Sequence, residues 1–68
     1  MDEETRNDVR RLLKTFGVQA DEAIMNYLDH APGNGPLTLR LTLEDVTGYE
    51  DKEPVERLHL EVTGQVRR

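Results

Sequence analysis

Apolar and polar residues alternate in two segments of the C-terminal half of the chain. Leucine occupies positions 37, 39, 41 and 43, and Leu58, Leu60 and Val62 repeat the two-residue period further on. Successive side chains of a β-strand point to opposite faces, so each segment would place its apolar residues on one face. The pattern predicts two strands, covering about 37–44 and 57–63, that pair as an antiparallel hairpin.

The polar face of this hairpin indicates how the strands pair. One register places Glu44 opposite Arg57 and Arg40 opposite Glu61, which gives two pairs of opposite charge. Sliding the strands to set Arg40 against His59 loses both pairs, each worth roughly 0.2 to 1 kcal/mol. We therefore expect Glu44 to pair with Arg57.

The N-terminal half has apolar residues at helical spacing. A first set is Val9, Leu12, Leu13 and Phe16, and a second set is Ala20, Ala23, Ile24, Tyr27, Leu28 and Ala31. Asp2 can cap a helix that contains the first set. Gly17 lies between the two sets, and glycine commonly ends a helix by adopting the left-handed conformation. We expect one helix to end at about Phe16 and a second to begin near Ala20.

These elements define an expected fold. Pro32 prevents the second helix from continuing, and the segment 32–36, Pro-Gly-Asn-Gly-Pro, would form a bent connector to the first strand. A chain of 68 residues has room for one hydrophobic core. The sequence thus predicts a single small α+β domain over 1–68, with a helical hairpin packed on an antiparallel β-hairpin in the order α-α-β-β.

The expected helix pair resembles two known arrangements. The segment from Leu12 to Leu28, followed by Gly33-Asn34, is similar to the first two helices of a ubiquitin-associated domain. Gly17-Val18 followed by Glu22-Ala23-Ile24 also resembles the helix pair of ribbon-helix-helix antitoxins. Each resemblance covers less than half of the chain and implies a generic helix–turn–helix, so we assign no functional residue from either.

Composition narrows the class of function. The chain has no cysteine, serine or tryptophan, which removes disulfides, thiolate metal sites and the two commonest nucleophiles. We therefore expect no enzymatic activity and no cofactor. No apolar run approaches the ~20 residues of a membrane helix, and the start Met1-Asp2-Glu3-Glu4 lacks the features of a secretory signal. We expect a cytoplasmic protein, and its arginine-rich, highly charged composition suggests a bacterial source.

The net charge of −5 comes from one segment. Between Glu44 and Glu56 there are six acidic residues and a single basic one, Lys52. Such a loop would repel nucleic acid and attract a basic protein, although it would also serve simply to keep a long loop solvated. The candidate partner-docking residues of this loop are Glu44, Asp45, Tyr49, Glu50, Asp51, Glu53 and Glu56.

Metal and nucleic-acid sites are weaker candidates. His30 and His59 have no neighbours at ligand spacing, and the acidic loop lacks the pattern of a calcium loop. We therefore expect no metal site. The polar sheet face has residue types that a β-ribbon uses in a DNA groove, but its arginines are expected to pair with glutamates. The candidate nucleic-acid-binding residues of this face are Thr38, Arg40, Thr42, Arg57 and His59. We therefore do not expect nucleic acid to be the main partner.

The first strand is an edge with little protection. It carries one charge between Leu37 and Leu43, and such an edge invites another strand. We expect a two-fold homodimer that joins two first strands into a four-stranded sheet, through Leu37, Leu39, Arg40, Leu41 and Leu43.

The sequence thus suggests a small acidic, non-catalytic protein that acts through protein–protein interaction. The alternatives are an antitoxin-like or inhibitor-like protein that neutralises a basic partner, and nucleic-acid binding through the polar sheet face.

Overall fold

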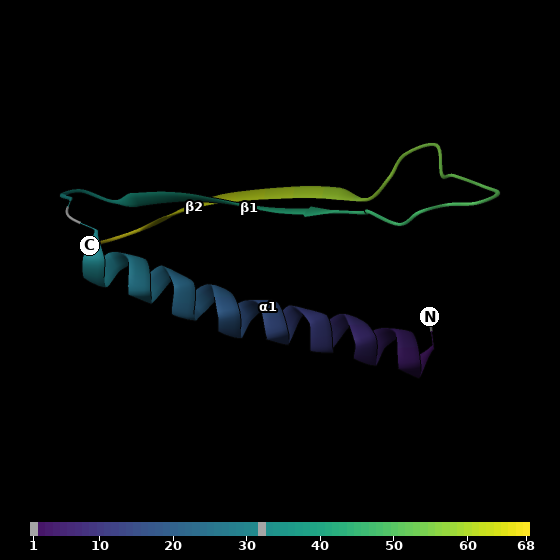
Figure 1. Cartoon of the computed structure of the whole chain (residues 1–68), viewed down its shortest axis with the longest axis horizontal. Helices are drawn as coiled ribbons and strands as arrows, with labels where there is room; N and C mark the ends of the chain where they lie inside the picture. Colours follow the sequence, from purple (N-terminus) through teal and green to yellow (C-terminus); the bar gives the residue numbers. More distant parts are fainter. Residues whose placement is uncertain (1, 32) are drawn as a thin grey trace. The chain divides into compact units, whose positions relative to one another are not determined.

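The computed structural model describes residues 2–31 and 33–68. Within these residues the chain forms helix α1 (Glu3–His30), followed by strands β1 (Leu37–Glu44) and β2 (His59–Val66), as Figure 1 shows. The chain divides into two units, Met1–Gly33 and Asn34–Arg68. The first unit therefore consists of the helix and the second of the β-hairpin.

Both ends of α1 have clear causes in the sequence. The Thr5 N–H donates a 2.8 Å hydrogen bond to the Asp2 carboxylate, which confirms Asp2 as the N-cap. This bond lowers the pKa of Asp2 from its usual value. At the other end Ala31 is extended, with φ −92° and ψ 122°, as expected for a residue that precedes proline. Its N–H still bonds to the Tyr27 carbonyl oxygen at 2.8 Å, so the last turn is closed.

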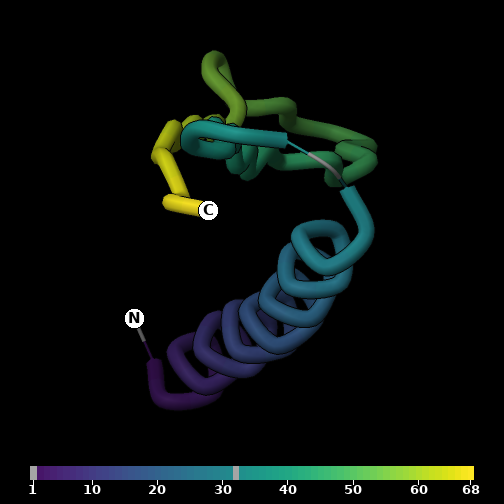
Figure 2. Tube along the Cα trace, turned by 90° about the vertical axis from the view of Figure 1, so that its left-hand side faces the viewer, coloured from purple at the N-terminus to yellow at the C-terminus, as the bar shows by residue number. Residues whose placement is uncertain are grey.

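The prediction of two helices is wrong, because α1 continues through Gly17 for 28 residues without a turn (Figure 2). Among the described residues, Gly35 alone has a positive φ, so Gly17 does not adopt the left-handed conformation. The spacing explains why. Phe16 and Ala20 are four residues apart, which keeps the two apolar sets on the same face of one helix. Glycine inside a helix costs about 1 kcal/mol relative to alanine, whereas a second helix would need a new nucleus.

The continuous helix also removes the basis of both resemblances. Each rested on a helix–turn–helix at Gly17, and that turn is absent from α1. The order of elements is α-β-β rather than α-α-β-β.

The β-hairpin is confirmed, but its register differs from the expected one by two residues. β1 and β2 are antiparallel, with Glu44 opposite His59 and Arg40 opposite Thr63. The apolar residues still share a face because a shift of two preserves the alternation. Their cross-strand partners are Leu37 with Val66, Leu39 with Gly64, Leu41 with Val62, and Leu43 with Leu60. In this register Arg57 precedes β2 and forms its contacts within the loop described below.

Neither unit contains a second layer. A single helix and a two-stranded sheet cannot enclose their own apolar side chains, and none of the residues that the structure describes is buried. Leu12 of α1 is 67% exposed and Leu60 of β2 is 54% exposed. Each unit therefore presents an apolar face that its own elements do not cover.

The continuous helix makes a prediction for Gly17. Gly17→Ala should raise the free energy of unfolding by about 1 kcal/mol, because alanine is the better residue inside a helix. Nothing lies within 4 Å of the position that the added Cβ would take. Thermal unfolding followed by helical circular dichroism measures the change. A lower midpoint in the variant would show that this position needs a left-handed glycine and that the two-helix arrangement is correct.

Candidate interaction site in the acidic loop

The loop between β1 and β2, residues 45–58, is organised by the side chain of Arg57. Its Nε and Nη2 donate to the Glu53 Oε1 atom at 3.0 and 2.7 Å. Its Nη1 donates to the carbonyl oxygens of Asp45, at 3.2 Å, and of Thr47, at 3.1 Å. The guanidinium group offers its donors in a fixed planar arrangement, so one side chain ties the start of the loop to its end.

Asp45 and Tyr49 complete this cluster. The Thr47 N–H donates to Asp45 Oδ1 at 2.9 Å, a turn that aspartate side chains commonly form, and the Tyr49 hydroxyl donates to the other carboxylate oxygen. The Arg57 guanidinium carbon lies 5.1 Å from the centre of the Tyr49 ring, within the range of a cation–π interaction. We call these five residues, Asp45, Thr47, Tyr49, Glu53 and Arg57, the loop cluster.

The loop cluster changes the acidity of two of its members. Hydrogen bonds from the Thr47 side chain, the Tyr49 hydroxyl and the Thr47 backbone stabilise the ionised carboxylate and lower the pKa of Asp45 to about 2. The same carboxylate accepts the Tyr49 proton and thereby raises the pKa of the Tyr49 hydroxyl above 10.0. Asp45 therefore carries its negative charge at any pH above about 2, and Tyr49 remains a hydrogen-bond donor at neutral pH.

The remaining acidic residues of the loop take no part in this cluster. Glu50, Asp51 and Glu56 are exposed, and within the described residues their side chains form no hydrogen bond or salt bridge. Glu44 closes β1 opposite His59. The predicted docking residues thus separate into two kinds. Asp45, Tyr49 and Glu53 shape the loop, and the other acidic side chains face solvent.

The role of Arg57 was not predicted, because the alternating pattern placed this residue in the second strand. In the strand it would have faced Glu44 in one exposed ion pair, whereas in the loop it forms four hydrogen bonds. The available signal was Glu53, which stands four residues before Arg57 and provides a carboxylate within the same loop.

The residues of the predicted dimer edge all belong to β1. The four leucines share the apolar face, and Arg40 lies on the opposite face, across from Thr63. In its own unit the sheet has the order β1-β2, so the outer edge of β1 has no strand beside it.

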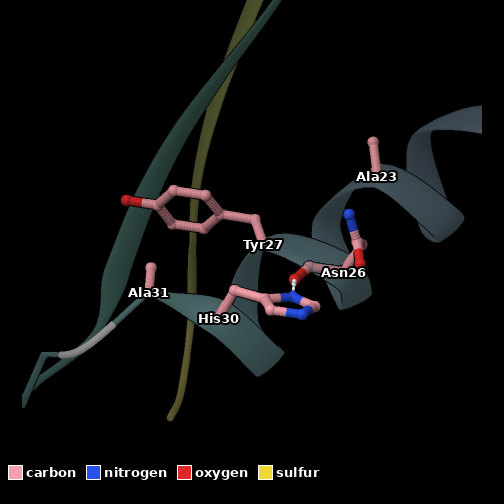
Figure 3. Close-up of a pocket in the computed structure, with 5 residues that line it drawn as sticks. All are labelled: Ala23, Asn26, Tyr27, His30 and Ala31. Atoms are coloured by element: carbon pink, nitrogen blue, oxygen red, sulfur yellow. Dashed lines mark hydrogen bonds between the residues drawn. The ribbon is translucent and has the colours of Figure 1, made fainter.

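The two histidines lie on different elements, His30 at the end of α1 and His59 at the start of β2. His30 Nδ1 lies 2.8 Å from the Asn26 carbonyl oxygen, one turn earlier in the helix. Figure 3 shows this ring among the side chains that line a hollow on the helix surface, with Asn26 on one side of the ring and Tyr27 and Ala31 on the other. All the residues that line this hollow lie between Ala23 and Ala31, at the C-terminal end of α1.

Metal-binding and membrane-spanning features are absent from the part of the chain that the structure describes. No three or more histidine or acidic side chains in residues 2–31 and 33–68 gather as metal ligands. The helix in these residues is too polar to span a lipid bilayer. Comparison of the chain with protein families, characterised proteins and solved structures gives no significant match.

The raised pKa of Tyr49 provides a test of the loop cluster. The Tyr49 hydrogen bond stabilises the fold below the usual tyrosine pKa of 10.0, and this stabilisation is lost as the pH rises through the higher folded-state pKa. In a Tyr27→Phe background, where Tyr49 is the sole tyrosine, absorbance should show ionisation above pH 10.0. Adding Asp45→Asn removes the accepting charge and should lower this midpoint. Identical midpoints in the two proteins would contradict the contact.

Proposed function

We propose that the protein is a non-catalytic, homodimeric bacterial protein of the cytoplasm that acts by presenting its acidic loop to a basic protein partner. The observation that carries this proposal is the separation of roles within the loop. The loop cluster restrains the backbone, while Glu50, Asp51 and Glu56 remain exposed and unengaged within the described residues.

A restrained acidic loop is suited to binding. A loop that is already ordered loses less conformational entropy on binding than a mobile one, so more of the contact energy remains as affinity. The exposed carboxylates also attract a basic surface at long range and increase the rate of encounter. Because Arg57 neutralises Glu53, the attraction comes chiefly from the acidic residues outside the loop cluster.

Composition and register support this class of function over the others. The chain has no serine or cysteine to act as a nucleophile, which favours binding over catalysis. Arg57 precedes β2 and points its donors into the loop, which leaves Arg40 as the one arginine on the polar sheet face. A smaller basic surface favours a protein partner over a nucleic acid.

A second copy of the chain would cover the apolar faces. Several large apolar side chains on α1 and on the hairpin are at least half exposed, including Phe16 at 51% and Val62 at 52%. Contact between two copies would remove part of this surface from water, at roughly 25 cal/mol per Å². A two-fold arrangement lets the same residues serve both chains.

The homodimer predicts a solution mass of twice that of one 7.8 kDa chain. Light scattering after size-exclusion chromatography at tens of micromolar measures it directly. A mass of 7.8 kDa under these conditions would contradict the dimer.

Neutralising the exposed loop charges should separate binding from folding. The triple variant Glu50→Gln, Asp51→Asn, Glu56→Gln leaves the loop cluster intact, so its unfolding midpoint should match that of the parent protein. Its capture of the native basic partner from a lysate, quantified by mass spectrometry, should fall at least severalfold. The parent's capture should weaken with added salt, because salt screens exposed charges.

A matched control removes the same charge elsewhere. The variant Glu4→Gln, Asp8→Asn, Glu61→Gln alters three acidic residues outside the loop and should capture the partner as the parent does. Equal capture by the loop variant, the control and the parent would show that the loop only solubilises the chain.

A further inference from the structure

The charges along α1 are arranged in blocks. The first turn is acidic, residues 6–14 contain four basic residues and one acidic residue, and residues 21–29 contain only acidic charges. The basic residues are Arg6, Arg10, Arg11 and Lys14, and the acidic residues of the later block are Asp21, Glu22 and Asp29. The two blocks have opposite sign and lie on either side of Val18, with their centres eight and seven residues from it.

The apolar residues along one face of α1 also differ in size between the two halves of the helix. We call six of them the seam, because they follow a seven-residue repeat: Val9, Leu13, Phe16, Ala20, Ala23 and Tyr27. Bulky residues precede the midpoint of the helix, and two alanines follow it. Leu13, Phe16 and Tyr27 are each about half exposed, so this seam is available for contact.

We propose that α1 pairs in antiparallel orientation with α1 of a second copy of the chain. This inference rests on the homodimer proposed above and identifies its interface. In this pairing Phe16 packs against the partner's Ala20, and Leu13 packs against the partner's Ala23. Val9 meets the partner's Tyr27 at each end of the seam. Every layer joins a larger side chain to a smaller one, which fills an interface without voids or overlap.

The parallel orientation lacks this fit. A parallel, in-register pair would place Phe16 against the partner's Phe16 and Ala20 against the partner's Ala20. One layer would then be overfilled and another would contain a void. The sizes of the side chains therefore favour the antiparallel pair.

Charge favours the same orientation. Antiparallel pairing places the basic block at 6–14 beside the partner's acidic block at 21–29, whereas parallel pairing places like charges together. Packed helices lie 8–10 Å apart, about one Debye length at physiological salt, so this difference is only partly screened. The acidic first turn extends beyond the paired region and avoids the partner's acidic block.

Cysteine cross-linking tests the orientation, because the chain has no cysteine of its own. A mixture of Leu13→Cys and Ala23→Cys proteins should form a disulfide-linked dimer on oxidation. Each variant alone should stay unlinked, because the two copies of either position lie about 15 Å apart along the antiparallel pair, beyond the reach of a disulfide. Arg11→Cys mixed with Met25→Cys is the matched control, because these positions lie level with each other in the pair but on the opposite face of α1, and they should not link.

The outcomes separate this inference from the proposed homodimer. Self-linking of Leu13→Cys would show a parallel pair and overturn the inference. A dimeric mass without any link between positions 13 and 23 would place the interface elsewhere, for which Leu41→Cys on the β1 edge provides the probe. A monomeric mass would contradict both the homodimer and its interface.

Charge reversal with rescue provides a second measurement. In the antiparallel pair Lys14 lies on the same flank as the partner's Asp21 and within one residue of its level, so Lys14→Glu or Asp21→Lys alone should weaken dimerisation severalfold. The double variant restores opposite charges across the pair and should recover the parent dissociation constant. A double variant that dimerises no better than the single variants would overturn the assigned orientation.

Discussion

The constraint on which the rest of the structure depends is that neither unit can bury its own apolar face. α1 is one helix and the hairpin is one two-stranded sheet, and a domain needs two layers to exclude water from its apolar side chains. Isolated helices and two-stranded hairpins are each marginally stable in water. The exposed leucines, valines and Phe16 are therefore the surface that the proposed second copy would cover.

Within that constraint, the acidic loop has its own source of order. Arg57 connects two carbonyl oxygens, one carboxylate and one aromatic ring, and this set of contacts replaces the apolar core that so short a loop cannot form. The consequence is a division of labour among residues of the same charge. Glu53 and Asp45 hold the loop in shape, and their acidic neighbours are exposed to solvent.

The sequence predicted the elements that depend on local pattern. The alternation of leucines identified the hairpin and its apolar face, and Asp2 identified the start of the helix.

The sequence predicted neither the continuity of α1 nor the strand register, because each is a choice between alternatives of similar energy. At Gly17, unbroken spacing outweighed a residue that often ends helices. At Arg57, several contacts within the loop outweighed one exposed ion pair with Glu44. The loop was singled out by its charge, but the cluster that shapes it depends on contacts among non-adjacent residues.

The most direct test of this account is thermal unfolding at different protein concentrations. If a second copy covers the apolar faces, folding is coupled to association, and the unfolding midpoint of the full chain must rise as its concentration is raised from micromolar to hundreds of micromolar. A midpoint that stays constant over this range would show that the chain is stable without a second copy. That result would contradict the central claim.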